Sequence, residues 1–173
     1  MSWTCFTHPR RSKGLKLFDA AHSRRPVRVC LWVLAFAWLA ICVSLSSQTG
    51  EASGRLSMSI ARFLTKLFRL PETKIADLNQ DLRLAAHIFS FFVLCGLFCM
   101  ASAVTFYKHA SAFLWPLPFC VLFAFLDEIR KAAIPGRHCS ISEAWLNTLG
   151  CVLGCAAAAG VLRFLCRGTK KEE

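Results

Sequence analysis

The residues best suited to chemistry lie between positions 127 and 137, directly after a long apolar run. Asp127 and Glu128 are adjacent acids, and Arg130 follows within one helical turn. Acids at the edge of an apolar segment are costly to bury unless they are paired. We therefore expect the partner to be Arg130 or Arg137, because a Pro-Gly turn just before Arg137 can return the chain toward the carboxylates.

Two further polar residues, Glu143 and Asn147, stand one helical turn apart where the next apolar run begins. Ser140 or Ser142 can cap a helix there, and an acid in the first turn is favoured by the helix dipole. A capping role and a binding role are both open for Ser140 and Glu143. Asn147 is expected either to join helices by hydrogen bonds or to form the floor of a site.

Arg83 and His87 are also one helical turn apart, so they share a face of any helix that contains them. The four-span topology described below places them at the membrane depth of Asp127, Glu128 and Arg137. This convergence predicts a shared polar site that faces outward. A histidine near a membrane interface can also be a plain hydrogen-bonding residue, and that alternative is open for His87.

Ten cysteines occur in the chain, and most of them lie inside apolar runs. Cys95 with Cys99, and Cys151 with Cys155, are spaced four residues apart. Neither pair has a histidine or carboxylate beside it at metal-ligand spacing. We therefore interpret these cysteines as small core residues and predict no metal site and no cofactor.

The chain that must position these groups has 173 residues, of which 55% are hydrophobic and only 18% are charged. Soluble domains have about a quarter charged residues, and here the charges cluster between long apolar stretches. This pattern predicts an integral membrane protein. The formal net charge of +11 is tied to the flanks of the apolar runs and lacks aromatic stacking groups, so we expect no nucleic-acid partner.

We predict an all-α membrane protein with four transmembrane helices and an amphipathic interfacial helix between the first and the second. The predicted spans are residues 29–45, 84–106, 112–126 and 144–165, and the interfacial helix covers 55–70. Pro116 and Pro118 make the third span short or kinked near its start. The predicted divisions are a basic segment at 1–28, a transmembrane domain at 29–165 and a tail at 166–173.

The first 28 residues carry seven Lys and Arg side chains and one acid, which favours a cytoplasmic N-terminus by the positive-inside rule. Four crossings then place the C-terminus in the cytoplasm as well. The alternative for the first apolar run is the core of a signal peptide, because residues 44–47 offer small side chains for cleavage. That run begins late and is longer than the roughly 7 to 15 residues of such a core.

Residues 55–70 present two faces at helical spacing. Arg55, Arg62, Lys66 and Arg69 lie on one face, and Leu, Ile and Phe side chains take the opposite face. Such a helix lies in the headgroup plane with its cations on phosphates, so anionic membrane lipids are the expected partners. The alternative is a loop helix packed on the other spans.

The fourth span carries a stripe of small residues, Gly150, Gly154 and Ala158, on the face that also holds Asn147. Small residues at this spacing let two helices approach closely in a membrane. We expect this stripe to serve helix packing.

The order of these groups resembles the VanZ-like family of small bacterial membrane proteins over about residues 44–165. The pieces that carry the resemblance are Ser46-Ser47-Gln48, Gly50-Glu51-Ala52-Ser53, Arg83 with His87, Asp127-Glu128, Pro135-Gly136-Arg137, Ser140, and Asn147 followed by Gly150 and Gly154. The chain departs from the family pattern at three positions: the family often has a second basic residue at Leu84, a glutamine at Lys131 and an aspartate at Glu143. Lys131 makes its motif more basic.

The family is named for a protein associated with low-level resistance to the glycopeptide teicoplanin. The resemblance therefore implies a role at the bacterial cell envelope, in the inner membrane, with a cell-wall precursor or glycopeptide as partner. We expect an outward-facing site for an anionic lipid-linked or cell-wall-related ligand. The expected anion-binding residues are Arg83, Arg130 and Arg137, oriented by Asp127 and Glu128.

The alternative function is an enzyme that acts on a lipid-linked envelope precursor, with Glu128 or His87 as general base. No nucleophile–base pair in the sequence requires this enzymatic function. A transporter is not favoured, because the spans hold few mid-membrane charges and no visible inverted repeat. The sequence indicates no oligomeric state.

Overall fold

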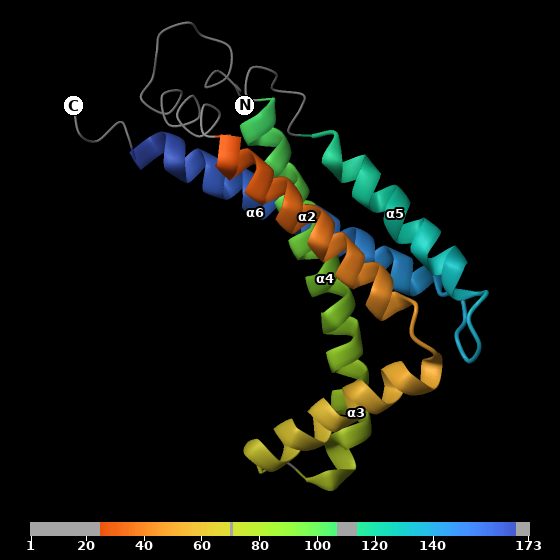
Figure 1. Ribbon diagram of the computed structural model, residues 1–173. Helices are drawn as coiled ribbons and strands as arrows, with labels where there is room; N and C mark the ends of the chain where they lie inside the picture. Colours follow the sequence, from red (N-terminus) through yellow and green to blue (C-terminus); the bar gives the residue numbers. More distant parts are fainter. Residues whose placement is uncertain (1–24, 70, 107–113, 169–173) are drawn as a thin grey trace, which may run out of the picture.

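The computed structural model describes residues 25–69, 71–106 and 114–168, and every regular element in them is helical. The predicted all-α class is therefore confirmed for this part of the chain. The elements are α2 (Arg25–Ser46), α3 (Gly50–Leu67), the short 3-10 helix η1 (Glu72–Lys74), α4 (Ile75–Thr105), α5 (Pro116–Lys131) and α6 (Ile141–Gly168). Figure 1 shows α2, α4, α5 and α6 as a bundle, with α3 lying across the far end of α4.

Three helical segments are long and apolar enough to cross a membrane: Arg25–Ser46, Glu72–Thr105 and Ile141–Phe164. They contain most or all of the first, second and fourth predicted spans. Helix α5 has 16 residues and a length of about 24 Å, short of the roughly 30 Å hydrocarbon core. The first two residues of the predicted third span, 112 and 113, lie outside the described residues. The predicted number of four crossings stays a prediction.

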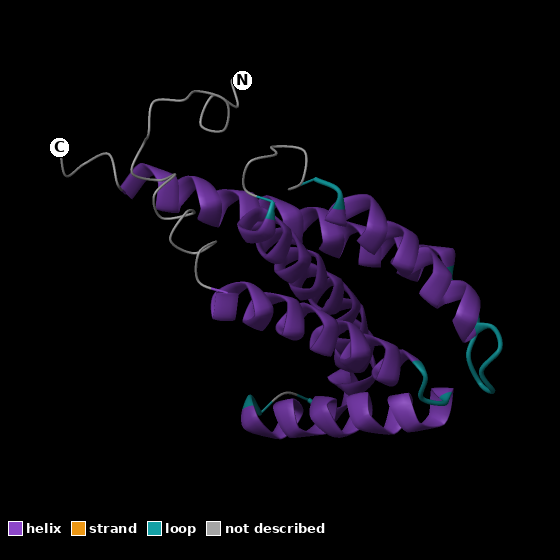
Figure 2. Cartoon of the chain, turned by 45° about the horizontal axis from the view of Figure 1, so that its top comes forward, coloured by secondary structure: helices purple, strands orange, loops and turns teal. Residues whose placement is uncertain are grey.

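The four bundle helices alternate in direction along the chain (Figure 1), and Figure 2 shows the helices from a second side. At one end, the Trp32 indole near the start of α2 donates to Thr105 Oγ1 at the end of α4 (2.9 Å). At the same end, the Trp115 indole just before α5 donates to Ser102 Oγ (2.8 Å). Helix α5 runs from there to the opposite end, called here the polar end, where α2 finishes and α6 begins.

Aromatic packing joins the helices around Phe98, a buried residue of α4. The Phe98 ring makes edge contacts with Trp32 and Phe36 of α2, with centroids 5.8 and 5.5 Å apart. It also lies 5.4 Å from the Phe119 ring of α5. Such pairs contribute about 0.5–1.5 kcal/mol beyond their buried area, so Phe98 fixes α2 and α5 on α4.

Glycines bring α4 and α6 into backbone contact. A Cβ atom on Gly150 would lie 2.4 Å from the Ile88 carbonyl oxygen, and one on Gly154 would lie 2.2 Å from the Phe92 carbonyl oxygen. Ala158, one turn further along, is buried in the same core. The close approach sets the position of His87 on α4 relative to the first turns of α6.

Helix α3 is amphipathic and begins at Gly50, five residues before the predicted start. The Thr49 side chain caps it by accepting a hydrogen bond from Ala52 N (3.3 Å), so the chain becomes helical as soon as the cap is in place. Ala61 and Thr65 are buried, and α3 packs on α4. Large apolar side chains on the other side stay exposed: Leu56, Ile60, Phe63, Leu67 and Phe68.

We predict that Gly154→Leu destabilises the bundle and that Gly160→Leu does not. The new side chain at Gly154 must push α4 and α6 apart, which costs at least about 2 kcal/mol, whereas a Cβ at Gly160 meets nothing within 4 Å. Thermal unfolding in detergent, followed by tryptophan fluorescence, measures the difference. Equal unfolding midpoints for the two variants would contradict close packing through Gly154.

Candidate functional site

The centre of the polar end is the side chain of Lys131 in the last turn of α5. Lys131 and Glu128 are each 2% exposed, and the Lys131 ammonium donates a very short hydrogen bond to Glu128 Oε1. The same ammonium lies 3.3 Å from Glu143 Oε2 and 3.9 Å from Asp127 Oδ2. One buried cation is therefore surrounded by three carboxylates from α5 and α6, an arrangement called here the ammonium cage.

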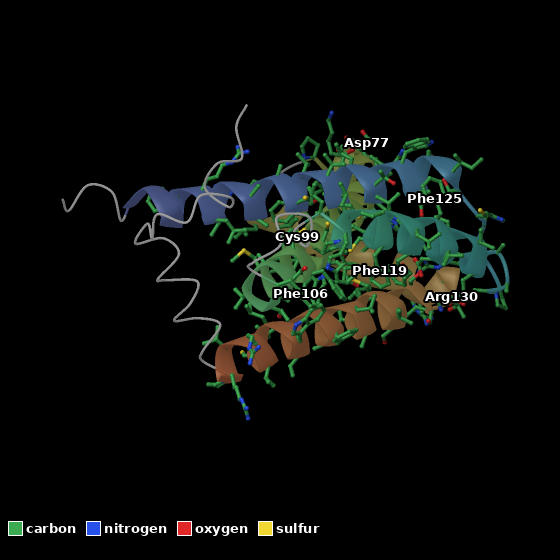
Figure 3. All side chains as sticks on the ribbon, turned by 90° about the horizontal axis from the view of Figure 1, so that it is seen from above. Asp77, Cys99, Phe106, Phe119, Phe125 and Arg130 are labelled. Carbon is green, nitrogen blue, oxygen red and sulfur yellow. The ribbon has the colours of Figure 1, made fainter. Side chains whose placement is uncertain are left out.

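Asp127 connects the ammonium cage to the end of α2. Its Oδ2 accepts a hydrogen bond from the Ser46 hydroxyl (2.6 Å), and its Oδ1 accepts one from Arg130 (2.9 Å). Arg130, labelled in Figure 3, also donates to the Ser47 hydroxyl (2.6 Å). The predicted Asp127–Arg130 pair is confirmed, and two consecutive serines hold it against α2.

His87 and Asn147 close the network from α4 and α6. The Asn147 amide nitrogen donates to Glu128 Oε1 (3.4 Å), which turns the Asn147 carbonyl oxygen toward His87 Nδ1 (3.2 Å). His87 Nε2 lies 3.2 Å from Glu143 Oε2. Both ring nitrogens of His87 thus lie within hydrogen-bond distance of side-chain oxygens on α6.

Ion pairs hold the three carboxylates of the network to two side-chain cations. The carboxylates are those of Asp127, Glu128 and Glu143, and the cations are Arg130 and Lys131. Charges in a low-dielectric setting are tolerated when they are paired and hydrogen-bonded. This pairing accounts for the charged side chains at the edge of an apolar bundle.

The first turn of α6 belongs to the same network. The Ser140 hydroxyl accepts a hydrogen bond from Glu143 N (3.4 Å), so Ser140 caps the helix as one of the two sequence interpretations had it. The Ser140 backbone N–H donates to Glu128 Oε2 (3.4 Å). The capping turn thus also holds a network carboxylate, and a role of Ser140 or Glu143 in ligand binding stays a prediction.

Two loops pack against each other beside the network. Arg137 Nε donates to the Gln48 carbonyl oxygen (3.0 Å), and Gly50 N–H donates to the Pro135 carbonyl oxygen (3.5 Å). Gly136 has φ +72°, a conformation that glycine adopts without strain. A Cβ on Gly50 would lie 2.0 Å from the Gly136 carbonyl oxygen, so glycine at both positions allows the contact.

A cavity of about 540 Å³ lies between α2, α3, α4 and α5, next to the ammonium cage. Its polar lining includes Arg83, Arg137 and Lys131, and its apolar lining includes Leu45, Leu56 and Phe89. Arg83 forms no ion pair or hydrogen bond within the described ranges, and neither does Arg137 beyond its bond to Gln48. The cavity therefore combines apolar walls with two guanidinium groups that lack carboxylate partners.

The predicted site residues divide into two groups. Six of them meet in one network, namely His87, Asp127, Glu128, Arg130, Glu143 and Asn147. Arg83 and Arg137 line the adjacent cavity instead. The sequence interpretation missed Lys131 as a member of the network, although its spacing of three from Glu128 and four from Asp127 is the signal of same-face pairing.

Three ligand atoms of His87, Glu128 and Glu143 lie within 4.8 Å of one another, a spacing at which a metal ion could bind. In the structure the Lys131 ammonium contacts both of these carboxylates. A divalent ion would have to displace that ammonium. The absence of a metal site stays a prediction.

We predict that Lys131→Met lowers stability by about 3 kcal/mol or more, because it leaves the buried Glu128 carboxylate without its cation. Lys66→Met is the matched control, since Lys66 is exposed on α3. The double variant Lys131→Met with Glu128→Gln should recover part of the loss. Thermal unfolding in detergent measures the unfolding midpoints of these three variants. Equal midpoints for Lys131→Met and the Lys66→Met control would contradict a stabilising role of the ammonium cage.

The comparison with protein-family models matches residues 31–163 to the family described as VanZ/LLP1. This range includes the whole network, from Ser46 to Asn147, and both cavity arginines. No curated protein matches the chain, and no solved structure does. The match covers well over half of the sequence, and the apolar helices agree with it in indicating a membrane protein. The chain belongs to the VanZ/LLP1 family.

Proposed function

We propose that this protein binds an anionic lipid-linked or cell-wall-related ligand of the bacterial envelope in the cavity beside the ammonium cage. The observation that carries the proposal is the pairing of apolar walls with Arg83 and Arg137, whose positive charges have no carboxylate partner in the described part of the chain. An amphiphile with a phosphate or carboxylate headgroup matches both surfaces. Guanidinium groups bind such headgroups through paired hydrogen bonds.

The three arginines have different roles in this proposal. Arg83 and Arg137 bind the anion, whereas Arg130 is held by Asp127 and Ser47 and fixes the end of α2. The ammonium cage supports the floor of the cavity, since Lys131 and Asp127 also line it. Ligand binding thus needs no change in the ion pairs of the network.

We further propose that helix α3 lies at the membrane surface. Its exposed apolar face includes Phe63 and Leu67, and Arg62 and Lys66 are exposed as well. A helix with these two faces binds at the headgroup level of an anionic membrane. Because Leu56 and Ile60 of α3 line the cavity, a lipid-linked ligand could enter it directly from the bilayer.

The proposed orientation places the polar end on the outer face of the bacterial inner membrane, with both termini in the cytoplasm. A ligand related to the cell wall would meet the site there. Sequestering such a ligand, or a glycopeptide that recognises it, is the proposed link to teicoplanin tolerance.

The enzyme alternative receives less support from the network. Glu128 is engaged by Lys131, Asn147 and the Ser140 backbone. Both nitrogens of His87 face acceptor oxygens. A general base needs a free acceptor within reach of the substrate proton, and neither group offers one.

We expect Cys139, an exposed residue of the loop between α5 and α6, to react with a membrane-impermeant thiol reagent in intact cells. Cys139→Ser should abolish that labelling. Labelling at Cys139 that requires permeabilised cells would reverse the proposed orientation and place the site in the cytoplasm.

We also expect purified protein to bind a polyprenyl phosphate in preference to the uncharged polyprenol of the same length, as measured by native mass spectrometry. Arg83→Gln and Arg137→Gln should each weaken phosphate binding about tenfold, the usual loss of a charged hydrogen bond. Arg62→Gln is the control, because it removes the same charge from α3 outside the cavity.

Equal binding of the phosphate and the alcohol would contradict an anion site, as would equal losses in all three arginine variants. The same samples test the enzyme alternative. A product of changed mass after incubation with the phosphate would favour catalysis over binding.

A further inference from the structure

A groove lies at the end of the bundle opposite the polar end, where the start of α2 lies beside the end of α4 (Figure 1). It encloses about 780 Å³ and shares no residue with the cavity beside the ammonium cage. Arg25 and Arg28 supply its charge, and its apolar lining includes Trp32, Phe36 and Ala37. This groove, called here the arginine groove, combines cations with an apolar surface at a place that the proposed function does not use.

The arginine groove runs along one face of α2 and changes from charged to apolar with depth. Arg25 and Arg28 lie in the first turn of the helix, and Ala37 lies at the apolar end of the lining. From Arg28 to Ala37 the helix rises about 14 Å, and one leaflet contributes about 15 Å to the hydrocarbon core of a bilayer. Because α2 is long and apolar enough to cross a membrane, the groove has the polarity and the depth of a phospholipid in one leaflet.

The two arginines of the groove lack partners among the residues that the structure describes. Neither side chain forms an ion pair or a hydrogen bond there, and Arg28 Nε is buried without an acceptor. A buried donor without an acceptor is costly. Rotation of the guanidinium toward a phosphate would supply acceptors, since arginine binds phosphate through paired hydrogen bonds. Basic pockets between membrane helices bind the headgroups of anionic lipids in this way.

The apolar wall of the groove is held in place by the protein itself. The Trp32 indole donates to Thr105 Oγ1 (2.9 Å), and the Thr105 hydroxyl donates to the Ala101 carbonyl oxygen (2.7 Å). The Trp32 ring stacks on the Phe36 ring with centroids 5.8 Å apart, and Phe36 stays 54% exposed. A wall that is already ordered loses little conformational entropy when a chain binds along it.

We infer that the arginine groove binds one anionic phospholipid, in the leaflet that surrounds the start of α2. The headgroup phosphate lies on Arg25 and Arg28, and one acyl chain lies along Trp32 and Phe36. A zwitterionic headgroup brings its own cation next to the two arginines, so an anionic headgroup binds more tightly. With the orientation proposed above, this is the cytoplasmic leaflet, and the site is separate from the ligand cavity at the polar end.

A second copy of the chain is a poorer occupant of the groove than a lipid. Two copies in one membrane have the same orientation, so a symmetric contact through this face brings together residues at equal depth. Arg25 and Arg28 of one copy would then face the same two cations of the other. The sequence before Arg25 is itself rich in Lys and Arg, so it offers no complementary charge either.

The inference is tested by native mass spectrometry of the detergent-purified full chain with phosphatidylglycerol and phosphatidylcholine of the same acyl chains. We expect one tightly bound phosphatidylglycerol per chain and about tenfold weaker binding of phosphatidylcholine. Arg28→Gln should weaken phosphatidylglycerol binding about tenfold, the usual loss of a charged hydrogen bond. Arg163→Gln is the matched control, because Arg163 is exposed near the end of α6 and lies outside the groove.

A second pair of variants tests the apolar part of the groove with both arginines in place. Ala37→Trp fills the groove and should abolish tight phosphatidylglycerol binding. Ala40→Trp adds the same side chain to an exposed position of α2 outside the groove and should bind as the wild type does. Loss of binding in both tryptophan variants, or in neither, would contradict an acyl chain along Trp32 and Phe36.

Three further results would overturn the inference. The first is equal binding of the two phospholipids, and the second is equal binding by Arg28→Gln and Arg163→Gln. The third is loss of phosphatidylglycerol in Arg83→Gln but not in Arg28→Gln, which would assign the lipid to the cavity beside the ammonium cage. Polyprenyl phosphate binding, measured on the same Arg28→Gln sample, should stay at the wild-type level, so the two proposed sites fail or succeed separately.

Discussion

The buried ammonium of Lys131 is the central interaction of the polar end. Three carboxylates at the edge of an apolar bundle repel one another, and each would pay a large desolvation cost without a cation between them. Helix α5 supplies both the ammonium and two of the acids, and α6 supplies the third. Because the ion pairs cross from α5 to α6, the two helices cannot shift along each other without exposing charge in a dry environment.

The apolar runs of the sequence were enough to predict the helices, because length and hydropathy determine which segments can cross a bilayer. They could not predict the extents of α3 and α5. The early start of α3 depends on the Thr49 cap, and the start of α5 at Pro116 follows from a ring that suits the first helical turn and interrupts a helix elsewhere. A capping residue and a proline, and not the mean hydropathy, thus determine where α3 and α5 begin.

The candidate site was predictable to the extent that its residues are close in the sequence. Asp127 and Arg130 are one turn apart, so their pairing follows from helix geometry. Ser46 lies 81 residues from its partner Asp127, and no periodicity encodes that contact. The cysteines show the same limit: their spacing of four residues within each pair is visible in the sequence, but only the packing of α4, α5 and α6 places Cys120 in the same buried core as the two pairs.

The length of α4 links the cavity to the thickness of the surrounding bilayer. With 31 residues, the helix is about 46 Å long, well beyond the roughly 30 Å hydrocarbon thickness, and its first turns carry α3. A helix longer than the bilayer adapts by tilting, and tilting α4 moves α3 relative to α2 and α5. Since α3 forms one wall of the cavity, hydrophobic mismatch would couple bilayer thickness to the width of the cavity.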